Sequence, residues 1–530
     1  MASFAASVPQ RSAPTREELC RLFVGKTVGE VPKPAAIMDV AVARRNCAAV
    51  DKAVAALGVG FRAHIKTHKT TELTRLQVQN LGPSQPINLV ASTLAEIEHL
   101  VPLIAEYASA GRSVNILYGI PLPPSQVSRL AHIARRIGVP GSISVLVDHP
   151  AQLEPLATTF HDTAGFPVKV FIKVDTGYHR AGLPPAALNK GGLIDRIAQL
   201  NTKVEFLGLY SHSSLSYNGN TPRDAMDALA GEIDGCMQAL RDCGAAFASL
   251  AATTTSQKQQ RQLVISVGAS PQIISVGNLL SSSSSSSSSS AADSDSANLR
   301  RSIAAVSSSP SSSTDSSSSF TTTLELHAGV YAVRDIQQLA TNAVPPSSSP
   351  SSGTASETTS STTATTTTTA ELYHIDEPEA HVAFSVAAEV CSVYNDHERA
   401  EPEALIAVGV LGLGREPCKM YPGWGILGTQ GVDGSGSGGR RIMISRISQE
   451  HGIAAWLPPT SEAGAGRGAR GEEHVLPPLP LEVGQVVRVY PNHACITGAM
   501  YGWYLVVDSD EKDPGAGEVV RDVWVRASGW

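Results

Sequence analysis

The chain has 530 residues, of which 42% are hydrophobic, with a formal net charge of −7 and a pI of about 6.1. This length and hydrophobic content predict one large domain and a second one, each with an ordinary core. No basic patch indicates nucleic-acid binding and no apolar run approaches the length that spans a bilayer, so we expect neither nucleic acid nor membrane as a partner.

The N-terminus and the cysteines bear on the compartment. Residues 1–15 contain Arg11 but no acidic residue and are rich in Ala and Ser, which is typical of organellar transit segments and also of ordinary frayed termini. The seven cysteines are scattered, without CxxC spacing or a secretory signal. We therefore expect a reducing, cytoplasmic location, with an organellar transit segment as the alternative.

Three stretches of low complexity interrupt the chain: Ser281–Ser290, Ser307–Ser319 and Ser347–Thr369. None can bury enough apolar surface to offset the entropy of ordering the chain. We interpret them as disordered insertions in surface loops, where long insertions are tolerated.

Before the third Ser/Thr stretch, apolar runs alternate with helical periodicity. Amphipathic segments such as Leu94–Tyr107 and Asp224–Cys243 lie between most of the runs. The expected strands are Phe61–Lys66, Ile87–Ala91, Val114–Tyr118, Ile143–Asp148, Val168–Asp175, Val204–Ser211, Leu263–Gly268 and Thr323–His327. Eight strands with helical connections predict an α/β fold, a (β/α)8 TIM-like barrel. The competing open, doubly wound sheet would place a glycine-rich turn after the first strand, where this chain has Lys66-Thr67-His68-Lys69.

After the third stretch the pattern changes to short strands punctuated by Gly and Pro, which predicts an all-β region. The expected strands are Val382–Val393, Ala404–Val410, Arg441–Ile447, Val486–Tyr490, Trp503–Val507 and Val523–Arg526. The expected organisation is a barrel over residues 36–345 with insertions near 281–319, a linker over 346–370 and a β domain over 371–530. Residues 1–35 are a candidate addition to the β domain.

Lys66 is the first candidate for chemistry, because a desolvated lysine can lose its proton and form a Schiff base. Alternation along an extended Phe61–Lys66 would put His64 and Lys66 on one face, at the end of a barrel strand where catalytic groups collect. The alternative is a solvated lysine in a basic turn.

Small residues follow the seventh and eighth expected strands, in Gly268-Ala269-Ser270-Pro271 and in His327-Ala328-Gly329-Val330. Such turns let backbone N–H groups approach an anion, and barrels often hold phosphate with the loops after their last two strands. Taken singly, either segment is also compatible with an ordinary turn.

Two rim segments add candidate side chains. Tyr210 and Tyr217 flank His212, and these rings could stack on an aromatic cofactor or form part of the core. Asp175 ends the fifth expected strand and Arg180 follows it, so both are expected near the same rim, where they could face a ligand or pair with each other.

His493 and Cys495 form the candidate metal site. A His and a Cys two positions apart on an extended strand project from the same side, and together they offer one imidazole nitrogen and one thiolate, a soft ligand pair suited to zinc. The alternative is a buried thiol beside an exposed histidine. Catalytic zinc sites usually have three protein ligands, so another side chain, water or substrate would complete the site.

Taken together, the motifs resemble those of the eukaryotic-type D-serine dehydratases. These are pyridoxal-phosphate (PLP) enzymes of the alanine-racemase-like fold (fold type III), related to the D-threonine aldolases. The motifs, in chain order, are R-A-H-I-K-T-H-K-T, V-D-T-G-Y-H-R-A-G, Y-S-H-S-S-L-S-Y, S-V-G-A-S-P, E-L-H-A-G-V-Y, R-I-S-Q-E-H-G and P-N-H-A-C-I-T. The resemblance covers most of the chain outside the Ser/Thr stretches.

The resemblance implies a barrel followed by a β domain, usually in a homodimer. It makes Lys66 the catalytic lysine that forms a Schiff base with PLP, and His493 and Cys495 the ligands of Zn²⁺. The positions that match PLP contacts are Tyr210, Tyr217, Ser270, Gly329 and Val330. The family usually has Asn where this chain has Val330, so a contact there would have to use the backbone.

The function implied is elimination of water from D-serine, a small-molecule D-amino acid substrate, to give pyruvate and ammonia. PLP acts as the electron sink, and zinc helps the 3-hydroxyl to leave as a Lewis acid. One alternative is retro-aldol cleavage of 3-hydroxy D-amino acids, as in D-threonine aldolases, although Cys495 favours elimination because those aldolases tend to have a carboxylate there. The other alternative is a non-catalytic PLP-binding protein.

Overall fold

The computed structural model describes residues 14–82, 85–252, 261–281, 291–307, 320–343, 375, 377–429, 440–458, 476–513 and 515–530. Apart from Ser281 and Ser307, the three Ser/Thr stretches lie outside the described residues, and so does the expected linker over 346–370. Residues 1–13 of the candidate transit segment also lie outside them. No helix of the described residues is both long and apolar enough to cross a membrane.

Eight parallel strands of the described chain close into a barrel in the order β2 to β9. Their bounds are β2 (Gly60–His64), β3 (Ile87–Ala91), β4 (Val114–Pro121), β5 (Ile143–Val147), β6 (Val168–Val174), β7 (Val204–Ser211), β8 (Arg261–Val267) and β9 (Phe320–Ala328). Each expected strand overlaps its observed counterpart, so the predicted barrel is confirmed. The strands could be recognised because they are covered on both faces; every residue of β5, for example, is buried.

Helices connect and cover the strands. The longer ones are α2 (Val40–Leu57), α3 (Thr71–Val78), α4 (Leu94–Ser109), α5 (Val127–Ile137), α8 (Leu193–Gln199), α9 (Pro222–Asp242), α10 (Gly244–Ala252) and α13 (Ala291–Ser307). Shorter ones are α6 (Leu153–Pro155), α7 (His161–Ala164), α11 (Ser270–Ser275), α12 (Asn278–Ser281) and α14 (Ile336–Leu339). Local signals set their ends. Helix α2 begins at Asp39, whose carboxylate accepts from two backbone N–H groups, and ends at Gly58 with φ of 64°.

The inside of the barrel has a polar layer below an apolar one. Arg62 and Glu325 form a buried ion pair with an Nε–Oε1 distance of 2.7 Å, and Arg62 also donates to Asn115. A TIM barrel core usually consists of branched apolar side chains, so this pair is unusual. The guanidinium lies 5.3 Å from the centre of the Phe171 ring. Phe171 belongs to the apolar layer above, which also contains Tyr210.

The second part is a nine-stranded sheet, counted over the described residues, in the order β11-β14-β13-β12-β15-β10-β1-β16-β17. Its strands are β1 (Ala35–Asp39), β10 (Phe384–Tyr394), β11 (Glu403–Ile406), β12 (Gly425–Leu427), β13 (Ile442–Ile447), β14 (Gly452–Trp456), β15 (Val486–Pro491), β16 (Trp503–Val507) and β17 (Asp522–Val525). Helices α1 (Arg16–Phe23), α15 (Pro378–His381), α16 (Val410–Leu413) and α17 (Ala494–Gly498) accompany it. The predicted all-β region is thus confirmed, although β1, β12 and β14 were not expected.

Strand β1 changes the expected domain boundary. The barrel was expected to begin at residue 36, but Ala35–Asp39 pairs antiparallel with β10 and parallel with β16 in the other sheet. Its five residues are too few to show a periodicity, and only its two neighbours, about 350 and 470 residues away, give it a place. Helix α1 packs against β17, so the described N-terminal residues join the β domain.

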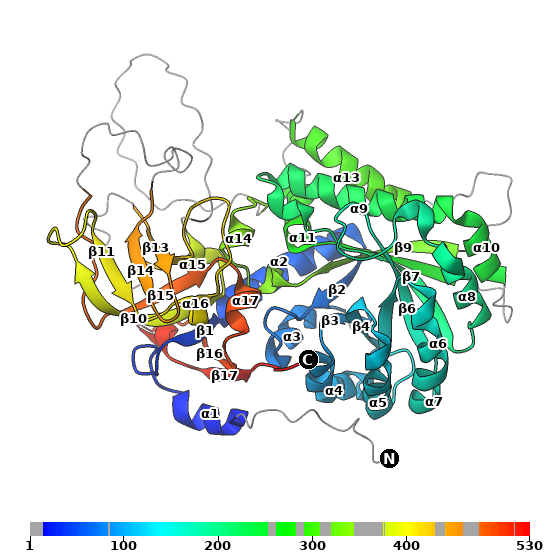
Figure 1. Ribbon diagram of the computed structural model, residues 1–530, viewed down its shortest axis with the longest axis horizontal. Helices are drawn as coiled ribbons and strands as arrows, with labels where there is room; N and C mark the ends of the chain where they lie inside the picture. The colour runs from blue at the N-terminus through cyan, green and yellow to red at the C-terminus, as the bar shows by residue number, and fades with distance from the viewer. Residues whose placement is uncertain are drawn as a thin grey trace.

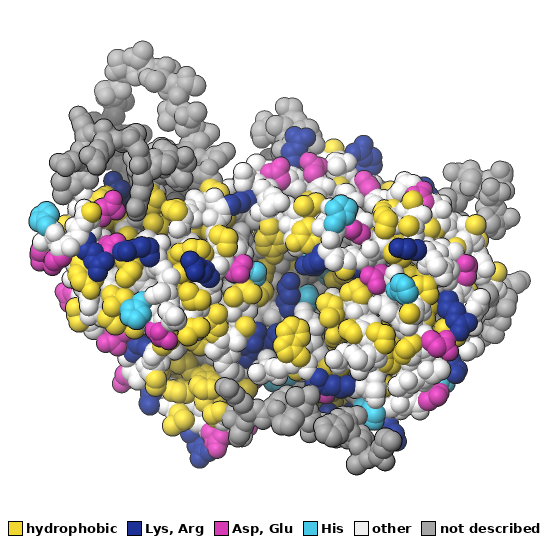
Figure 2. All heavy atoms as spheres, in the orientation of Figure 1, with side chains coloured by type: hydrophobic (Ala, Val, Ile, Leu, Met, Phe, Trp, Pro, Cys, Tyr) yellow, Lys and Arg dark blue, Asp and Glu magenta, His cyan; other side chains and the backbone are white. Residues whose placement is uncertain are grey.

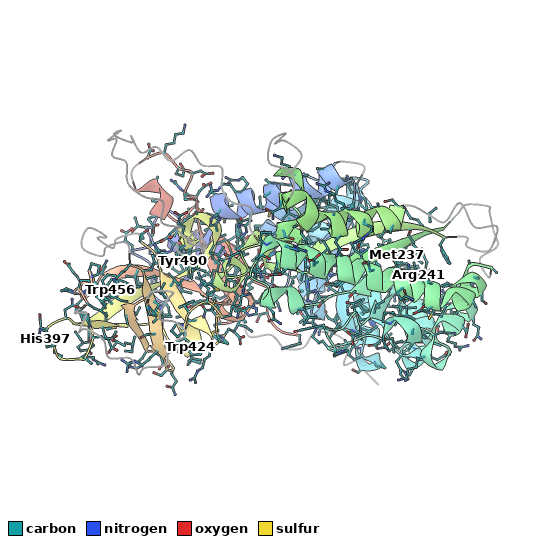
Figure 3. All side chains as sticks on the ribbon, turned by 90° about the horizontal axis from the view of Figure 1, so that it is seen from above. Met237, Arg241, His397, Trp424, Trp456 and Tyr490 are labelled. Atoms are coloured by element: carbon teal, nitrogen blue, oxygen red, sulfur yellow. The ribbon has the colours of Figure 1, made fainter. Side chains whose placement is uncertain are left out.

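The two parts lie side by side, with α2 running between them and the C-terminal end of the chain, after β17, reaching back toward the barrel (Figure 1). Asn46 of α2 donates to the backbone oxygens of Ala332 and His381, one on each side. Seen from above, α9 with Met237 and Arg241 lies along the barrel half, whereas Trp424, Trp456, Tyr490 and His397 lie in the β half (Figure 3).

Candidate active site

A cavity of about 720 Å³ lies where the carboxyl ends of the barrel strands meet the β domain. In the view of Figure 2, basic side chains gather along this junction. The barrel contributes His64, Lys66, Tyr178, Arg180, His212, Ser214, Tyr217, Asn218, Gly268, Ala269, Ser270, His327, Ala328, Gly329 and Val330. The chain after the barrel contributes Asp335, Gln337, Ala340, Glu416, Pro417, Cys418, Lys419, His493 and Cys495.

The structure thus brings together seven of the eight residues singled out from the sequence. Lys66, Tyr217, Ser270, Gly329, Val330, His493 and Cys495 all line the same cavity. Tyr210 is the exception, since it lies outside the lining set. Its buried ring stacks on the ring of His327, with 4.2 Å between centroids, and His327 in turn lines the cavity.

Lys66 lies in the turn after β2, not on the strand as expected. The strand ends at His64, because the turn closes through a hydrogen bond from the Lys69 N–H to the Ile65 oxygen and Lys69 adopts a φ of 53°. Both His64 and Lys66 nevertheless line the cavity. Among the described residues, the Lys66 amine has no hydrogen-bonding or ion-pair partner, so it is available to a ligand.

Three histidines on the barrel wall are neutral. Burial lowers the pKa of His64, His212 and His327 well below the usual value, and the nearby Lys66 cation adds to this at the first two. His212 donates from Nδ1 to the Gly268 oxygen at 2.7 Å. The Nε2 atom of His327 is buried without a partner among the described residues, although the residue lines the cavity. Such an orphaned polar atom indicates that a ligand belongs beside it.

The two small-residue turns keep side chains away from one end of the cavity. A Cβ on Gly268, whose φ is 142°, would lie 2.5 Å from the His327 oxygen, and a Cβ on Gly329 would lie 3.2 Å from His64. Only glycine therefore fits at Gly268, and little more fits at Gly329. The Tyr217 hydroxyl lies beside Ser270, at the start of α11. This end of the cavity offers backbone groups and hydroxyls, a set suited to an anion.

His493 and Cys495 come from a strand-to-helix turn, so the expectation that they lie on an extended strand is wrong. Strand β15 ends at Pro491. His493 occupies the N-cap position of α17 without a side-chain capping hydrogen bond, and Cys495 lies in the first turn of that helix. The helix starts here because Asp335 accepts a hydrogen bond from the Ala494 N–H at 2.9 Å. Both side chains nevertheless line one cavity, His493 from the extended N-cap position and Cys495 from the first helical turn.

The surroundings of this pair suit a metal only in part. The Nδ1 atom of His493 is buried without a hydrogen bond and lies 3.9 Å from a carboxylate oxygen of Glu416. The Cys495 sulfur lies 3.1 Å from the Thr67 hydroxyl oxygen. The described residues contain no group of three His, Cys, Asp or Glu side chains arranged to hold a metal ion. A metal on this pair would therefore keep positions open for water or substrate.

The segment after β6 shows whether Asp175 and Arg180 pair with each other or have separate roles. Asp175 accepts from the His179 ring at 2.9 Å and from two backbone N–H groups, which lower its pKa against the opposing effect of burial. Arg180 instead lies over the ring of Tyr178 and lines the cavity. Asp175 is thus a structural residue of the turn, and Arg180 presents a permanent positive charge to the cavity.

One wall of the cavity was not expected from the sequence; it is formed by Glu416, Pro417, Cys418 and Lys419. Lys419 reaches across to the barrel and donates to the backbone oxygens of Tyr217, at 3.0 Å, and of Gly219. This segment joins α16 to β12 without periodicity. The available signal was a pair of charges and a cysteine within a loop rich in Gly and Pro, a pattern too common to single out.

Comparisons with known proteins agree with this architecture. A family model described as "Putative serine dehydratase domain" matches residues 383–507, and one described as "Alanine racemase, N-terminal domain" matches residues 38–281. The chain is 29% identical to D-serine dehydratase of Schizosaccharomyces pombe, covering 97% of this chain and 96% of that one. It is 26% identical to D-serine dehydratase of Saccharomyces cerevisiae, covering 96% and 98%. The resemblance inferred from the motifs is confirmed.

Solved structures share the fold. D-threo-3-hydroxyaspartate dehydratase from Delftia sp. HT23 superposes with a TM-score of 0.59 at 22% identity, covering 95% of this chain and all of that one. A cysteine-to-alanine variant of D-threo-3-hydroxyaspartate dehydratase, described as being in the metal-free form, superposes with a TM-score of 0.60 at 22% identity and the same coverage.

Proposed function

Since the chain belongs to the family of alanine-racemase-like D-serine dehydratases, we propose that it is a PLP-dependent lyase that eliminates water from D-serine, giving pyruvate and ammonia. One observation carries this proposal: the Lys66 amine, the anion-binding turns and the His493/Cys495 pair form the walls of one cavity. An elimination needs a base at Cα and help for the leaving group at Cβ, and the two sets supply these from opposite walls.

The barrel wall fits PLP. Lys66 would hold the cofactor covalently through its partner-free amine. Tyr217, Ser270 and the backbone of Gly329 and Val330 would receive the phosphate, because small residues keep that end of the cavity clear. When bound, PLP supplies an electron sink for the negative charge that develops at the substrate's Cα.

The three neutral histidines of the barrel wall would contact the ligand without acting as the base. Tyr210 would support the site from behind, through its stack on His327, and the unpartnered Nε2 of His327 would face the ligand. Because burial lowers the pKa of these rings, they are weaker bases than an ordinary imidazole and compete little for the α-proton. The Lys66 Nζ is therefore the base we assign to the α-proton, and Arg180 is the fixed cation available to an anionic group of the substrate.

The β-domain wall would hold zinc through His493 and Cys495. An imidazole nitrogen and a thiolate are ligands that zinc prefers, and the buried Nδ1 of His493 lacks a hydrogen-bonding partner among the described residues. The metal-free form described for D-threo-3-hydroxyaspartate dehydratase supports a metal in this fold. Bound zinc would supply Lewis-acid polarisation of the substrate's 3-hydroxyl.

Product analysis with two substrates tests the proposal. With D-serine, we expect pyruvate and ammonia in equal amounts, no reaction with L-serine, and loss of pyruvate formation after thorough chelation. With D-threonine, a dehydratase gives 2-oxobutyrate, whereas an aldolase gives glycine and acetaldehyde. Glycine from D-threonine, or full activity after zinc removal, would contradict the proposed reaction or the role of the metal.

We also propose that the enzyme is a homodimer in a reducing, cytoplasmic compartment. Leu411 of α16, Ile496 of α17 and Met500 just after it are large, exposed apolar side chains, as expected for a surface that a second copy covers. All seven cysteines are free of disulfides, which supports the reducing compartment. Light scattering and subcellular fractionation test the two parts separately.

A further inference from the structure

A direct contact joins the turn that carries Lys66 to the helix that carries Cys495. The hydroxyl oxygen of Thr67, the residue after Lys66, lies 3.1 Å from the Cys495 sulfur, a contact between residues 428 positions apart. Thr67 is 1% exposed. Its hydroxyl has no other hydrogen-bonding partner among the described residues, so the contact with sulfur is the one that satisfies it.

The direction of this hydrogen bond follows from the chemistry of a metal ligand. Cysteine binds a metal as its thiolate, which accepts hydrogen bonds and cannot donate one. With a metal on Cys495, the Thr67 hydroxyl must therefore be the donor. A hydrogen bond to a ligating group fixes its orientation and alters how much electron density it gives the metal.

The turn is held firmly on the barrel side. The Lys69 ammonium pairs at 2.9 Å with Glu96, which is fully buried, and the His68 ring contacts the side chains of Thr70 and Gln77 at 3.1 and 3.0 Å. The β domain also contacts this turn, since the Tyr504 hydroxyl donates to the Thr67 backbone oxygen at 3.5 Å, and a Cβ on Gly498 of α17 would lie 2.6 Å from that hydroxyl. Thr67 thus projects from a turn held by an ion pair and hydrogen bonds onto a closely packed helix.

We propose that Thr67 is a positioning residue for the metal centre. Its hydroxyl donates to the Cys495 sulfur and orients that ligand for the metal. Because the same turn carries Lys66, the contact also fixes the distance between the amine that removes the α-proton and the metal that assists the leaving group. This inference rests on the proposed function, since it takes Cys495 as a metal ligand.

Metal binding to the purified full-length protein tests the inference without relying on turnover. Thr67→Val keeps the branched shape and removes the hydroxyl, Thr67→Ser keeps the hydroxyl, and Thr67→Ala is a second variant without it. Zn²⁺ affinity is measured by competition with a chromophoric chelator, and the sulfur-to-metal charge-transfer band is recorded with Co²⁺ in place of zinc. Thr74→Val is the matched control, because Thr74 is a fully buried threonine whose hydroxyl donates to the Thr70 oxygen instead.

We expect Thr67→Val and Thr67→Ala to weaken Zn²⁺ binding by about 10- to 100-fold and to shift the Co²⁺ band. Thr67→Ser should stay within about threefold of the natural protein, and Thr74→Val should leave affinity and band unchanged. In every variant the absorbance of PLP bound to Lys66 should persist. Unchanged affinity and an unchanged band in Thr67→Val would overturn the inference, as would joint loss of the PLP band, which would mean a general packing role.

Cys495→Ala separates this inference from the proposed function. If that variant binds Zn²⁺ as tightly as the natural protein, the metal site itself is misassigned. If it loses Zn²⁺ and the Co²⁺ band while Thr67→Val retains both, the proposed metal site stands and the role given to Thr67 is wrong.

Discussion

The barrel and the β domain are assembled from different kinds of contact. In the barrel, strands pair in the order in which the chain makes them, from β2 to β9. In the β domain, neighbours come from distant parts of the chain, and β1 lies between β10 and β16. The barrel wall carries the residues that we propose for the cofactor, whereas the β-domain wall carries His493 and Cys495, the pair that we propose for the metal.

Because the two walls are built differently, the two requirements of an elimination are met by separate parts of the molecule. These are removal of the α-proton and assistance to the leaving group. The turns at the carboxyl ends of barrel strands are set locally, each by its own strand and helix. His493 and Cys495 reach the cavity only because the whole β domain docks against the carboxyl ends of the barrel strands. Damage to one wall should therefore leave the chemistry of the other wall measurable.

The largest expected effect is on the barrel wall. Lys66→Ala should abolish pyruvate formation from D-serine, by on the order of 10⁴-fold or more, because it removes both the attachment of PLP and the base. The PLP absorbance band should disappear while Zn²⁺ binding persists. Lys203→Ala is the control, since Lys203 precedes β7 at the opposite end of the barrel. A PLP band that survives in Lys66→Ala would show that another lysine holds the cofactor.

A change to the proposed metal ligand on the β-domain wall should remove the metal and leave PLP bound. Cys495→Ala should lower turnover by about 10³-fold, the effect of losing several kcal/mol of Lewis-acid assistance, while the PLP band remains. Cys391→Ala, at an exposed cysteine of β10 in the same sheet, should change neither activity nor metal content. Metal analysis together with steady-state kinetics checks both variants, and equal metal content in the two would refute the assignment of Cys495.

A third change probes the barrel interior below the site. Arg62→Met leaves Glu325 as an uncompensated buried charge, so it should lower the free energy of unfolding by about 3–5 kcal/mol. Adding Glu325→Leu should recover part of this loss, because no lone charge then stays buried. Urea unfolding followed by circular dichroism measures the double variant and the two single variants, Arg62→Met and Glu325→Leu. A double variant whose loss equals the sum of the two single losses would argue against a coupled pair.

The smallest expected effect is a pH dependence of folding stability that arises from Asp51 in α2, the helix between the two parts. Burial raises the pKa of Asp51 to about 6, although Asn80 donates to it, whereas the unfolded value is near 3.8. The folded state therefore favours the protonated carboxyl, and this contribution to stability is lost as pH rises from about 4 through 6.

Replacing the Asp51 carboxyl by an amide removes this loss of stability at higher pH. Relative to the natural protein, Asp51→Asn should gain stability between pH 4 and pH 7, by about 1 kcal/mol once solvent screening of this half-buried group is allowed for. Melting temperatures of both proteins across this range test the sign. A difference that does not change with pH would show that Asp51 titrates normally in the folded protein.

The sequence predicted the barrel well because each of its elements carries its own signal. Strands such as Ile87–Ala91 and Val204–Ser211 were predicted with their observed bounds, since they are largely apolar runs most of whose residues are buried. In the β domain, the three-residue strand Gly425–Leu427 shows no periodicity, and pairing with β13 and β15 is what makes it a strand. Residues Val410–Leu413 form a helix although they continue an apolar run.

The same division applies to the site. The sequence by itself determined which residue types were available: an early lysine, two small-residue turns and a late His-x-Cys. Only the tertiary structure placed the lysine in a turn, put His493 and Cys495 at the start of a helix, and added the wall around Glu416 and Lys419. Local propensity and burial act over a few residues and can be read from them. Contacts such as that between Thr67 and Cys495, 428 residues apart, exist only once two separately built parts have docked.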